Sequence, residues 1–326
     1  MTRTPASSHV RSLDPDRDFE PLADLIATVN DEDRLDWFPT AAALHSEWGA
    51  RAGFDPLADV RLVEADDRLI AAGRVDWRER SGKVTHRIEI WVHPGVRRQG
   101  LGTDLLAWAE ARARELVADG AGGPADLPHL LSGVAYQDSP SAVAFAEAAG
   151  YAPVRYTFEM TRPLDQPIPE APLPDGIEIR PVDEAQYRAI WDADTEAFRD
   201  HWEATVRQEE DFVEFVEHPD TDTTLWQVAW DGDEVAGSVI NVIPASENAR
   251  TGVDSGWLEH VSVRRPWRGR GLAGALIERS LTLLRDRGMT VAALGVDAEN
   301  PTGALGLYER FGFRPVRTFV TYRKRV

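Results

Sequence analysis

The apolar and polar positions repeat one order of predicted elements twice along the chain. Period-two alternation predicts strands, and three-to-four spacing predicts amphipathic helices. In the first half the predicted strands are 9–13, 60–64, 69–77, 84–92, 130–135 and 154–161, with helices at 19–26, about 102–117 and 139–149. In the second half the predicted strands are 177–180, 225–230, 235–242, 256–263, 291–296 and 313–323, with helices at 183–198, 272–287 and after Pro301.

Turn residues and prolines divide these elements. Asp66-Asp67, Ser81-Gly82 and Asp231-Gly232-Asp233 predict hairpin turns, and Asp16 or Asp18 is a candidate cap for the first helix. Five prolines fall within residues 163–174, which predicts an extended linker. We therefore predict two domains, 1–163 and 164–326, of class α/β (α+β), each with a mixed, mostly antiparallel sheet flanked by helices.

A glycine-rich turn stands between a predicted strand and a predicted helix in the second half. Its sequence, Arg268-Gly269-Arg270-Gly271-Leu272-Ala273, follows the apolar run Val261-Ser262-Val263. Glycines let the backbone approach a ligand closely, and amides at a helix N-terminus attract anions. The turn therefore predicts a phosphate cradle with arginines as a cationic rim, although a plain glycine cap gives the same short pattern.

A second copy of this turn lies in the first half. Arg97-Arg98-Gln99-Gly100-Leu101-Gly102 stands 171 residues earlier, in the same strand–turn–helix context. Both copies follow the pattern Arg-x-x-Gly-x-Gly/Ala, and both have a proline upstream (Pro94 and Pro266). Repetition of one motif in one context indicates that the chain is built from two copies of the same unit.

Two segments resemble the signatures of one enzyme superfamily. Residues 261–273 resemble the acetyl-CoA pyrophosphate motif of the GNAT N-acetyltransferases. Residues 300–313 resemble that superfamily's second signature, an Asn, then a helix that carries a Tyr, then Gly-Phe. The tandem arrangement is similar to that of mycothiol synthase and related actinobacterial double-GNAT proteins. The resemblance implies two tandem GNAT-like domains and acetyl-CoA as the acyl donor.

The resemblance also implies which residues hold acetyl-CoA. The strand before the cradle would open toward the pantetheine arm, with backbone groups of Val261 and Val263 pairing with it. Asn300 would bind that arm, or would cap the helix that Pro301 opens. The implied set is Val261, Ser262, Val263, Arg268, Gly269, Arg270, Gly271, Leu272, Ala273, Gly274 and Asn300, with Val92, Arg97, Arg98, Gln99, Gly100, Leu101 and Gly102 as the counterparts in the first half.

Proton transfers need an acid and a base. Tyr308 stands where the superfamily keeps its Tyr, and a phenol of ordinary pKa about 10 can protonate a departing thiolate; packing under the sheet is its alternative role. Glu259 is the nearest carboxylate for the base, and His260 would replace it if the strand bulges. The superfamily often places a carboxylate four residues before Val261, where this chain has Trp257.

The first half lacks the acid. Alignment of Gly150-Tyr151 with Gly312-Phe313 places Ala146 at the Tyr308 position and Asp138 at the Asn300 position. We therefore predict that the second half is catalytic and the first is not. The loop after the second half's first helix would cover the acceptor with Phe198, His201 and Trp202, because aromatic rings suit an amine with an apolar part.

Composition narrows the choice of partner. The chain has no Cys, which excludes disulfides and an acyl-cysteine intermediate, and its eight His show no metal-ligand spacing. The net charge of −19 disfavours nucleic acid and anionic membrane and favours cationic amines. No apolar run reaches membrane-spanning length and no signal core is present, so we expect a cytoplasmic protein. A tandem repeat could take the place of a dimer, which would leave a monomer.

Four functions are weighed. The favoured one is acetyl-CoA-dependent N-acetyl transfer, without a metal, to a small-molecule amine. Acetylation of a protein or peptide amine would need an open groove. A non-catalytic acyl-CoA-binding regulatory protein would suit Ala146 but not Tyr308. An aminoacyl-tRNA-dependent transferase would need a basic surface, which the charge of −19 opposes.

Overall fold

The computed structural model describes residues 8–49, 53–300 and 303–326, and the chain forms two compact units. The first unit consists of Met1–Val154 together with Val320–Val326, and the second consists of Arg155–Phe319. The proline-rich segment and the predicted boundary after residue 163 therefore lie inside the second unit.

The first unit is a sheet with one parallel step. Its strands run β1 (His9–Arg11), β2 (Val60–Ala65), β3 (Arg68–Arg80), β4 (Lys83–Val92) and β5 (His129–Tyr136), followed by the last residues of β12 (Arg314–Arg325). The pairs β1–β2, β2–β3 and β3–β4 are antiparallel, and the pair β4–β5 is parallel. The helices are α1 (Phe19–Asp33), α2 (Ala41–Gly49), α3 (Pro56–Asp59), α4 (Leu101–Ala118) and α5 (Pro140–Ala148).

The end of the chain completes the core of the first unit. Val320 and Tyr322 of β12 are 2% and 3% exposed and pack with Leu131 of β5 and Tyr151. The ammonium of Lys324 donates to the Glu110 carboxylate at 2.8 Å and to the Ala149 carbonyl at 2.9 Å. Residues from the last strand therefore stabilise a unit that consists mostly of the first half of the sequence.

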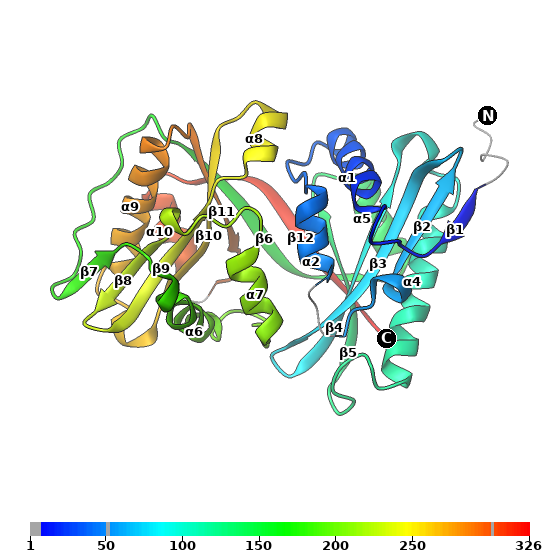
Figure 1. Cartoon of the computed structure of the whole chain (residues 1–326), viewed down its shortest axis with the longest axis horizontal. Helices are drawn as coiled ribbons and strands as arrows, with labels where there is room; N and C mark the ends of the chain where they lie inside the picture. The colour runs from blue at the N-terminus through cyan, green and yellow to red at the C-terminus, as the bar shows by residue number, and fades with distance from the viewer. Residues whose placement is uncertain (1–7, 50–52, 301–302) are drawn as a thin grey trace. The chain divides into compact units, whose positions relative to one another are not determined.

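The second unit repeats the arrangement (Figure 1). Its strands run β6 (Ala152–Pro163), β11 (Val291–Asp297), β10 (Ser255–Val263), β9 (Glu234–Val242), β8 (Gln227–Asp231) and β7 (Ile177–Arg180). Among these pairs β10 and β11 are parallel and the others are antiparallel. The helices are α6 (Tyr187–Phe198), α7 (Glu209–Glu217), α8 (Ala245–Thr251), α9 (Leu272–Asp286) and α10 (Ala304–Arg310).

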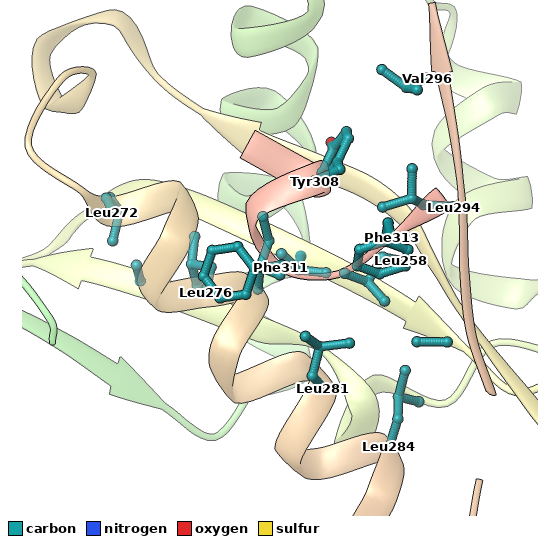
Figure 2. Close-up of a cluster of buried hydrophobic side chains, with 14 of the residues drawn as sticks. Leu258, Leu272, Leu276, Leu281, Leu284, Leu294, Val296, Tyr308, Phe311 and Phe313 are labelled. Atoms are coloured by element: carbon teal, nitrogen blue, oxygen red, sulfur yellow. The ribbon is translucent and has the colours of Figure 1, made fainter. Parts of the chain in front are cut away.

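Two apolar clusters cover the two faces of the second unit's sheet. Successive strand residues point to opposite faces, and Ala229 accordingly joins one cluster while Val228 and Trp230 join the other. The first cluster contains the buried side of α9 and residues of α10, and Figure 2 shows it from Leu272 to Tyr308. The second contains Ile190 of α6 and packs against Phe215 of α7. The helices thus bury both faces of β8–β10.

The predicted class is confirmed as a mixed, mostly antiparallel sheet flanked by helices. The three hairpin turns form where predicted, and Asp66, Asp67, Ser81, Gly82 and Gly232 all have positive φ. Sequence patterns missed the short helices α3, α7 and α8. No helix in the described ranges is long and apolar enough to cross a membrane.

Two predicted helix starts differ in detail. Asp18 precedes α1, but its side chain accepts no cap hydrogen bond and instead pairs with Arg11 at 2.9 Å. Pro301 lies outside the described residues, and α10 begins at Ala304 after Gly303, whose φ is +74°. The local sequence predicts both helix starts. At α1, however, Asp18 forms an ion pair in place of a cap, and at α10 a glycine with positive φ precedes the helix.

Candidate active site

The glycine turn forms a cradle at the start of α9. Gly269 and Gly271 have φ of +74° and +87°, a backbone conformation that residues with a Cβ rarely adopt. The first turn of α9 carries no acidic residue, so its free amide groups and the helix dipole can meet an anion. Gly269, Gly271, Leu272, Ala273 and Gly274 line one side of a cavity of about 300 Å³.

The first arginine of the motif holds the cradle together. Its Nε donates to the Val263 carbonyl at 2.8 Å, and its Nη1 and Nη2 reach Asp200 at 2.6 Å and the Ala197 carbonyl at 3.1 Å. Arg268 therefore fastens the end of α6 to the cradle, which differs from the cationic rim expected for its side chain. Arg270 is exposed and makes no ion pair with any described residue, but it does not line the cavity.

The strand before the cradle separates from its parallel neighbour. β10 pairs with β11 only from Ser255 to Trp257, opposite 291–293, although both strands continue. From Leu258 onward the edge of β10 toward β11 has no strand partner in the described chain. Val261, Ser262 and Val263 line the cavity there. This open edge is the arrangement expected for a strand whose backbone pairs with an extended ligand.

Tyr308 lies on α10 at the same cavity. It is 6% exposed, and its ring meets Phe313 edge-on with centroids 6.1 Å apart, at the edge of the cluster in Figure 2. Burial raises the pKa of its hydroxyl to about 12, so the group keeps its proton near neutral pH. Both roles considered from sequence, acid and packing ring, are therefore compatible with its position.

The position of Asn300 supports its predicted roles less well than the position of Tyr308 does. Its backbone carbonyl accepts from the Gly303 amide at 3.4 Å, and Gly303, not Asn300, precedes the first residue of α10. Asn300 is not among the residues that line the cavity. The alternative role as cap of α10 is therefore wrong for the helix as it is formed, and contact with a pantetheine arm stays a prediction.

Only part of the predicted acceptor loop lines the cavity. Phe198 and His201 line the cavity, and their rings lie 4.3 Å apart. Burial lowers the pKa of His201, which favours its neutral form. Trp202 does not line the cavity and lies under the Arg155 guanidinium at 5.2 Å. Two of the three predicted residues therefore share a cavity with Tyr308.

The strand β10 bulges beside the open edge. Leu258 pairs with Asn241 and His260 with Ile240, so Glu259 is an extra residue without a partner position. Leu258 and Val261 consequently pack against the same cluster, so residues 257, 259 and 261 do not share one face of the strand. The Glu259 side chain is exposed, but the surrounding protein displaces water from its carboxyl, and this desolvation raises the pKa of the carboxyl.

Sequence reasoning missed two charged residues next to the bulge. Asp194 of α6 is completely buried, and its Oδ2 lies 2.8 Å from Nη1 of Arg207 and 3.1 Å from Nδ1 of His260. Burial opposes the charge of Asp194, but His260 and Arg207 hold its pKa below the ordinary value. The available signal was an aspartate that interrupts the apolar stripe of a predicted helix.

The first unit keeps the shape of the cradle but changes its contents. Arg97 donates to the Val92 carbonyl and to Asp33, as Arg268 does to its own neighbours. Arg98 adopts φ +64° where the second unit has Gly269. Asp104 stands in the first turn of α4, so a carboxylate lies near the helix N-terminus where it disfavours an anion, and a Cβ on Gly100 would be 3.9 Å from it.

Comparisons with known proteins agree with this repeated site. The mycothiol acetyltransferase of Geodermatophilus obscurus is 29% identical over 328 residues, which cover 99% of each chain. A GCN5-related N-acetyltransferase from Sphaerobacter thermophilus is 30% identical, with a TM-score of 0.72 over 99% of this chain and 97% of that one. A tandem GNAT protein from the clavulanic acid biosynthesis pathway shares the fold at 18% identity, with a TM-score of 0.67 over 98% of both chains.

One family model matches the chain twice. The model described as the acetyltransferase (GNAT) family matches residues 22–122 and again residues 185–313. The two matches contain the two cradles and together cover more than half of the chain. The repeated cradle and the open strand beside it are therefore those of an N-acetyltransferase, and the chain belongs to the acetyltransferase (GNAT) family as a tandem member.

Proposed function

We propose that the protein transfers the acetyl group of acetyl-CoA to the amine of a small molecule and that the second unit carries out the reaction. The observation that carries this proposal is a single cavity. It is lined by the cradle, by the open edge of β10 and by Tyr308, so an anion site, a site for an extended arm and a proton donor meet in one place. These are the three parts that direct transfer from a thioester requires.

The reaction balances with groups of the second unit. The neutral amine nitrogen attacks the thioester carbonyl, a C–N bond forms and the C–S bond breaks. The amine loses one proton to a base, for which Glu259 is the sequence-based candidate, and the leaving thiolate takes one proton from the Tyr308 hydroxyl. Amides of the cradle would hold the pyrophosphate, and backbone groups of Val261 and Val263 would hold the pantetheine arm.

Three differences favour the second unit over the first as the catalytic one. Asp104 places negative charge at the first cradle, whereas the corresponding turn of α9 has none. The register between β3 and β4 is unbroken, so the first unit has no bulge that matches the one at Glu259. Ala146, the residue aligned with Tyr308, has no proton to give.

A small-molecule acceptor is supported by relatives and by charge. The Geodermatophilus relative, which matches over nearly its whole length, is named for mycothiol, a small molecule. The net charge of −19 favours a cationic amine over nucleic acid. We test this by following thiol release from acetyl-CoA with a panel of amines that contains mycothiol without its acetyl group, glucosamine, a lysine peptide and a peptide with a free N-terminus.

The acid is tested by Tyr308→Phe. We expect kcat to fall 10²- to 10⁴-fold because the general acid is lost, with little change in the KM of acetyl-CoA. Acetylated small amines identified by mass spectrometry would support the proposal. Acetylation of the peptides alone would replace the acceptor class, and undiminished kcat in Tyr308→Phe would remove the acid.

The division between the units is tested by two matched glycine variants. Gly271 and Gly100 have similar φ, +87° and +94°, so an alanine strains each cradle in the same way. In calorimetric titration with acetyl-CoA we expect one site, lost in Gly271→Ala and kept in Gly100→Ala. Loss of binding in Gly100→Ala, or two sites in the unaltered protein, would contradict the division.

A further inference from the structure

A buried carboxylate contacts His260 and has no role in the proposed transfer of the acetyl group. Asp194 is 0% exposed, and a carboxylate in that environment is costly unless cations surround it. Arg207 and His260 both approach its Oδ2, at 2.8 and 3.1 Å. His260 Nδ1 is buried and faces Asp194 Oδ2, so the two groups form an ion pair when the imidazole is protonated.

The bulge places His260 beside the cavity. His260 does not itself line the cavity, but the next residue, Val261, does, as does Phe198, whose ring centroid is 5.2 Å from that of His260. The ring of Phe215 lies nearly parallel to His260 at 6.3 Å. The His260 side chain is 31% exposed although Nδ1 is buried, so the accessible part of the ring is the part away from Asp194.

We infer that His260 is the base that takes the proton from the acceptor amine, and that Asp194 is a positioning residue that orients its ring. This inference rests on the proposed function and names the base within it. With Nδ1 turned to the carboxylate, the proton of the neutral ring resides on Nδ1 and the lone pair on Nε2. Nε2 accepts the amine proton as the C–N bond forms, and Tyr308 protonates the departing sulfur.

The alternative bases lack such support. Glu259 is exposed, and its carboxylate makes no hydrogen bond or ion pair with a described side chain. His201 lines the cavity, but its ring nitrogens make no hydrogen bond with any described residue, so nothing fixes its tautomer. In the first unit the residue 171 positions before His260 is Glu89, which pairs with Arg74 and Arg87. The second unit alone therefore has this histidine and carboxylate.

The charges around His260 set the pH range of the reaction. Burial lowers the pKa of its imidazole, but Asp194 on α6 and Glu259 on its own strand raise it, and Arg207 in the loop after α6 lowers it. The net pKa lies above the ordinary histidine value. Because a base must be deprotonated, kcat/KM falls on the acidic side of that pKa.

The test compares pH profiles of kcat/KM with acetyl-CoA and mycothiol without its acetyl group. We expect His260→Gln to lower kcat/KM 10²- to 10⁴-fold and to abolish the acidic limb, while the Kd for acetyl-CoA stays unchanged. Glu259→Gln and His201→Gln should keep the limb. His218→Gln removes a histidine of the same unit that lies at the C-terminal end of α7, 4.0 Å from Asp220, and should leave the profile as it is. A limb that survives His260→Gln would overturn the inference.

The positioning role of Asp194 is tested separately, through the pKa of His260. Asp194→Asn removes the charge that raises the pKa of His260, so the limb should move to lower pH. NMR titration of the His260 imidazole measures the same shift without any acceptor. An unchanged His260 titration in Asp194→Asn would refute the coupling. If the unaltered protein acetylates no amine of the panel, the proposed function fails, while the NMR result still decides whether the pair exists.

Discussion

The last residues of the chain should control the stability of the first unit. Val320 on β12 is 2% exposed and packs in the cluster that contains Leu131 and Tyr151. Val316 lies on the same strand but is 57% exposed, which makes it a matched control. We therefore compare Val320→Ala with Val316→Ala, two variants that remove the same atoms from buried and exposed positions.

The magnitude follows from what the substitution removes. Valine to alanine deletes two methyl groups, and each buried carbon of this kind contributes about 0.8 kcal/mol. The transfer contribution is then about 1.6 kcal/mol, and the cavity left in a packed core adds to it. We expect Val320→Ala to lower the free energy of unfolding by about 2–3 kcal/mol and Val316→Ala to change it by less than about 0.5 kcal/mol.

Urea unfolding measures the change, and hydrogen exchange locates it. Peptides from β5 and α5 should exchange faster in Val320→Ala, because they belong to the unit that Val320 completes. Peptides from α9 should keep their protection at low denaturant. Equal stability of the two variants, or faster exchange confined to β6 and β11, would refute the assignment of the chain end to the first unit.

Two further predictions concern the first unit. His86 is fully buried with its Nε2 3.0 Å from Nδ1 of His129, and burial, followed by the charge of His129, lowers the pKa of His86 to about 4. Below the unfolded value of about 6.5 the unfolded chain binds more protons, so stability should fall by about 3 kcal/mol between pH 6.5 and pH 4. Urea unfolding across that range checks this, and His86→Gln should flatten the dependence. Arg98→Gly should raise the free energy of unfolding by about 0.5–1 kcal/mol, because relief of left-handed strain exceeds the added entropy of the unfolded chain; a loss of stability would show that the exposed Arg98 side chain makes a contact of value.

Local sequence patterns predicted the turns and the cradle, because these features depend on residues that are close together in the sequence. The hairpin at Ser81-Gly82 needs two positive φ values, and the pair supplies them. The cradle needs a glycine where φ is +87°, and Gly271 stands there before a helical pattern. These features were readable because one short stretch of sequence contains both the cause and the structure.

Other features depend on residues that are distant in sequence. Asp194 interrupts the apolar stripe of the predicted helix 183–198, and its partners Arg207 and His260 cannot be read from the local pattern. The sequence did not predict whether the strand bulges at Glu259, because the register of β10 is set by its pairing with β9. The prolines at 163–174 mark an extended segment, but the compact units also depend on which strands β6 and β12 join.

The two cradles separate the shape of a site from its chemistry. Arg97 and Arg268 make equivalent bonds, so the clamp that holds the turn is common to both units. Such a clamp stabilises the turn whether or not a ligand binds, and its presence is therefore no sign of activity. The groups that act on a ligand differ, because Asp104 adds negative charge to one cradle only. A short cradle motif thus predicts the turn with more certainty than the reaction, and the residues around it must decide which copy is catalytic.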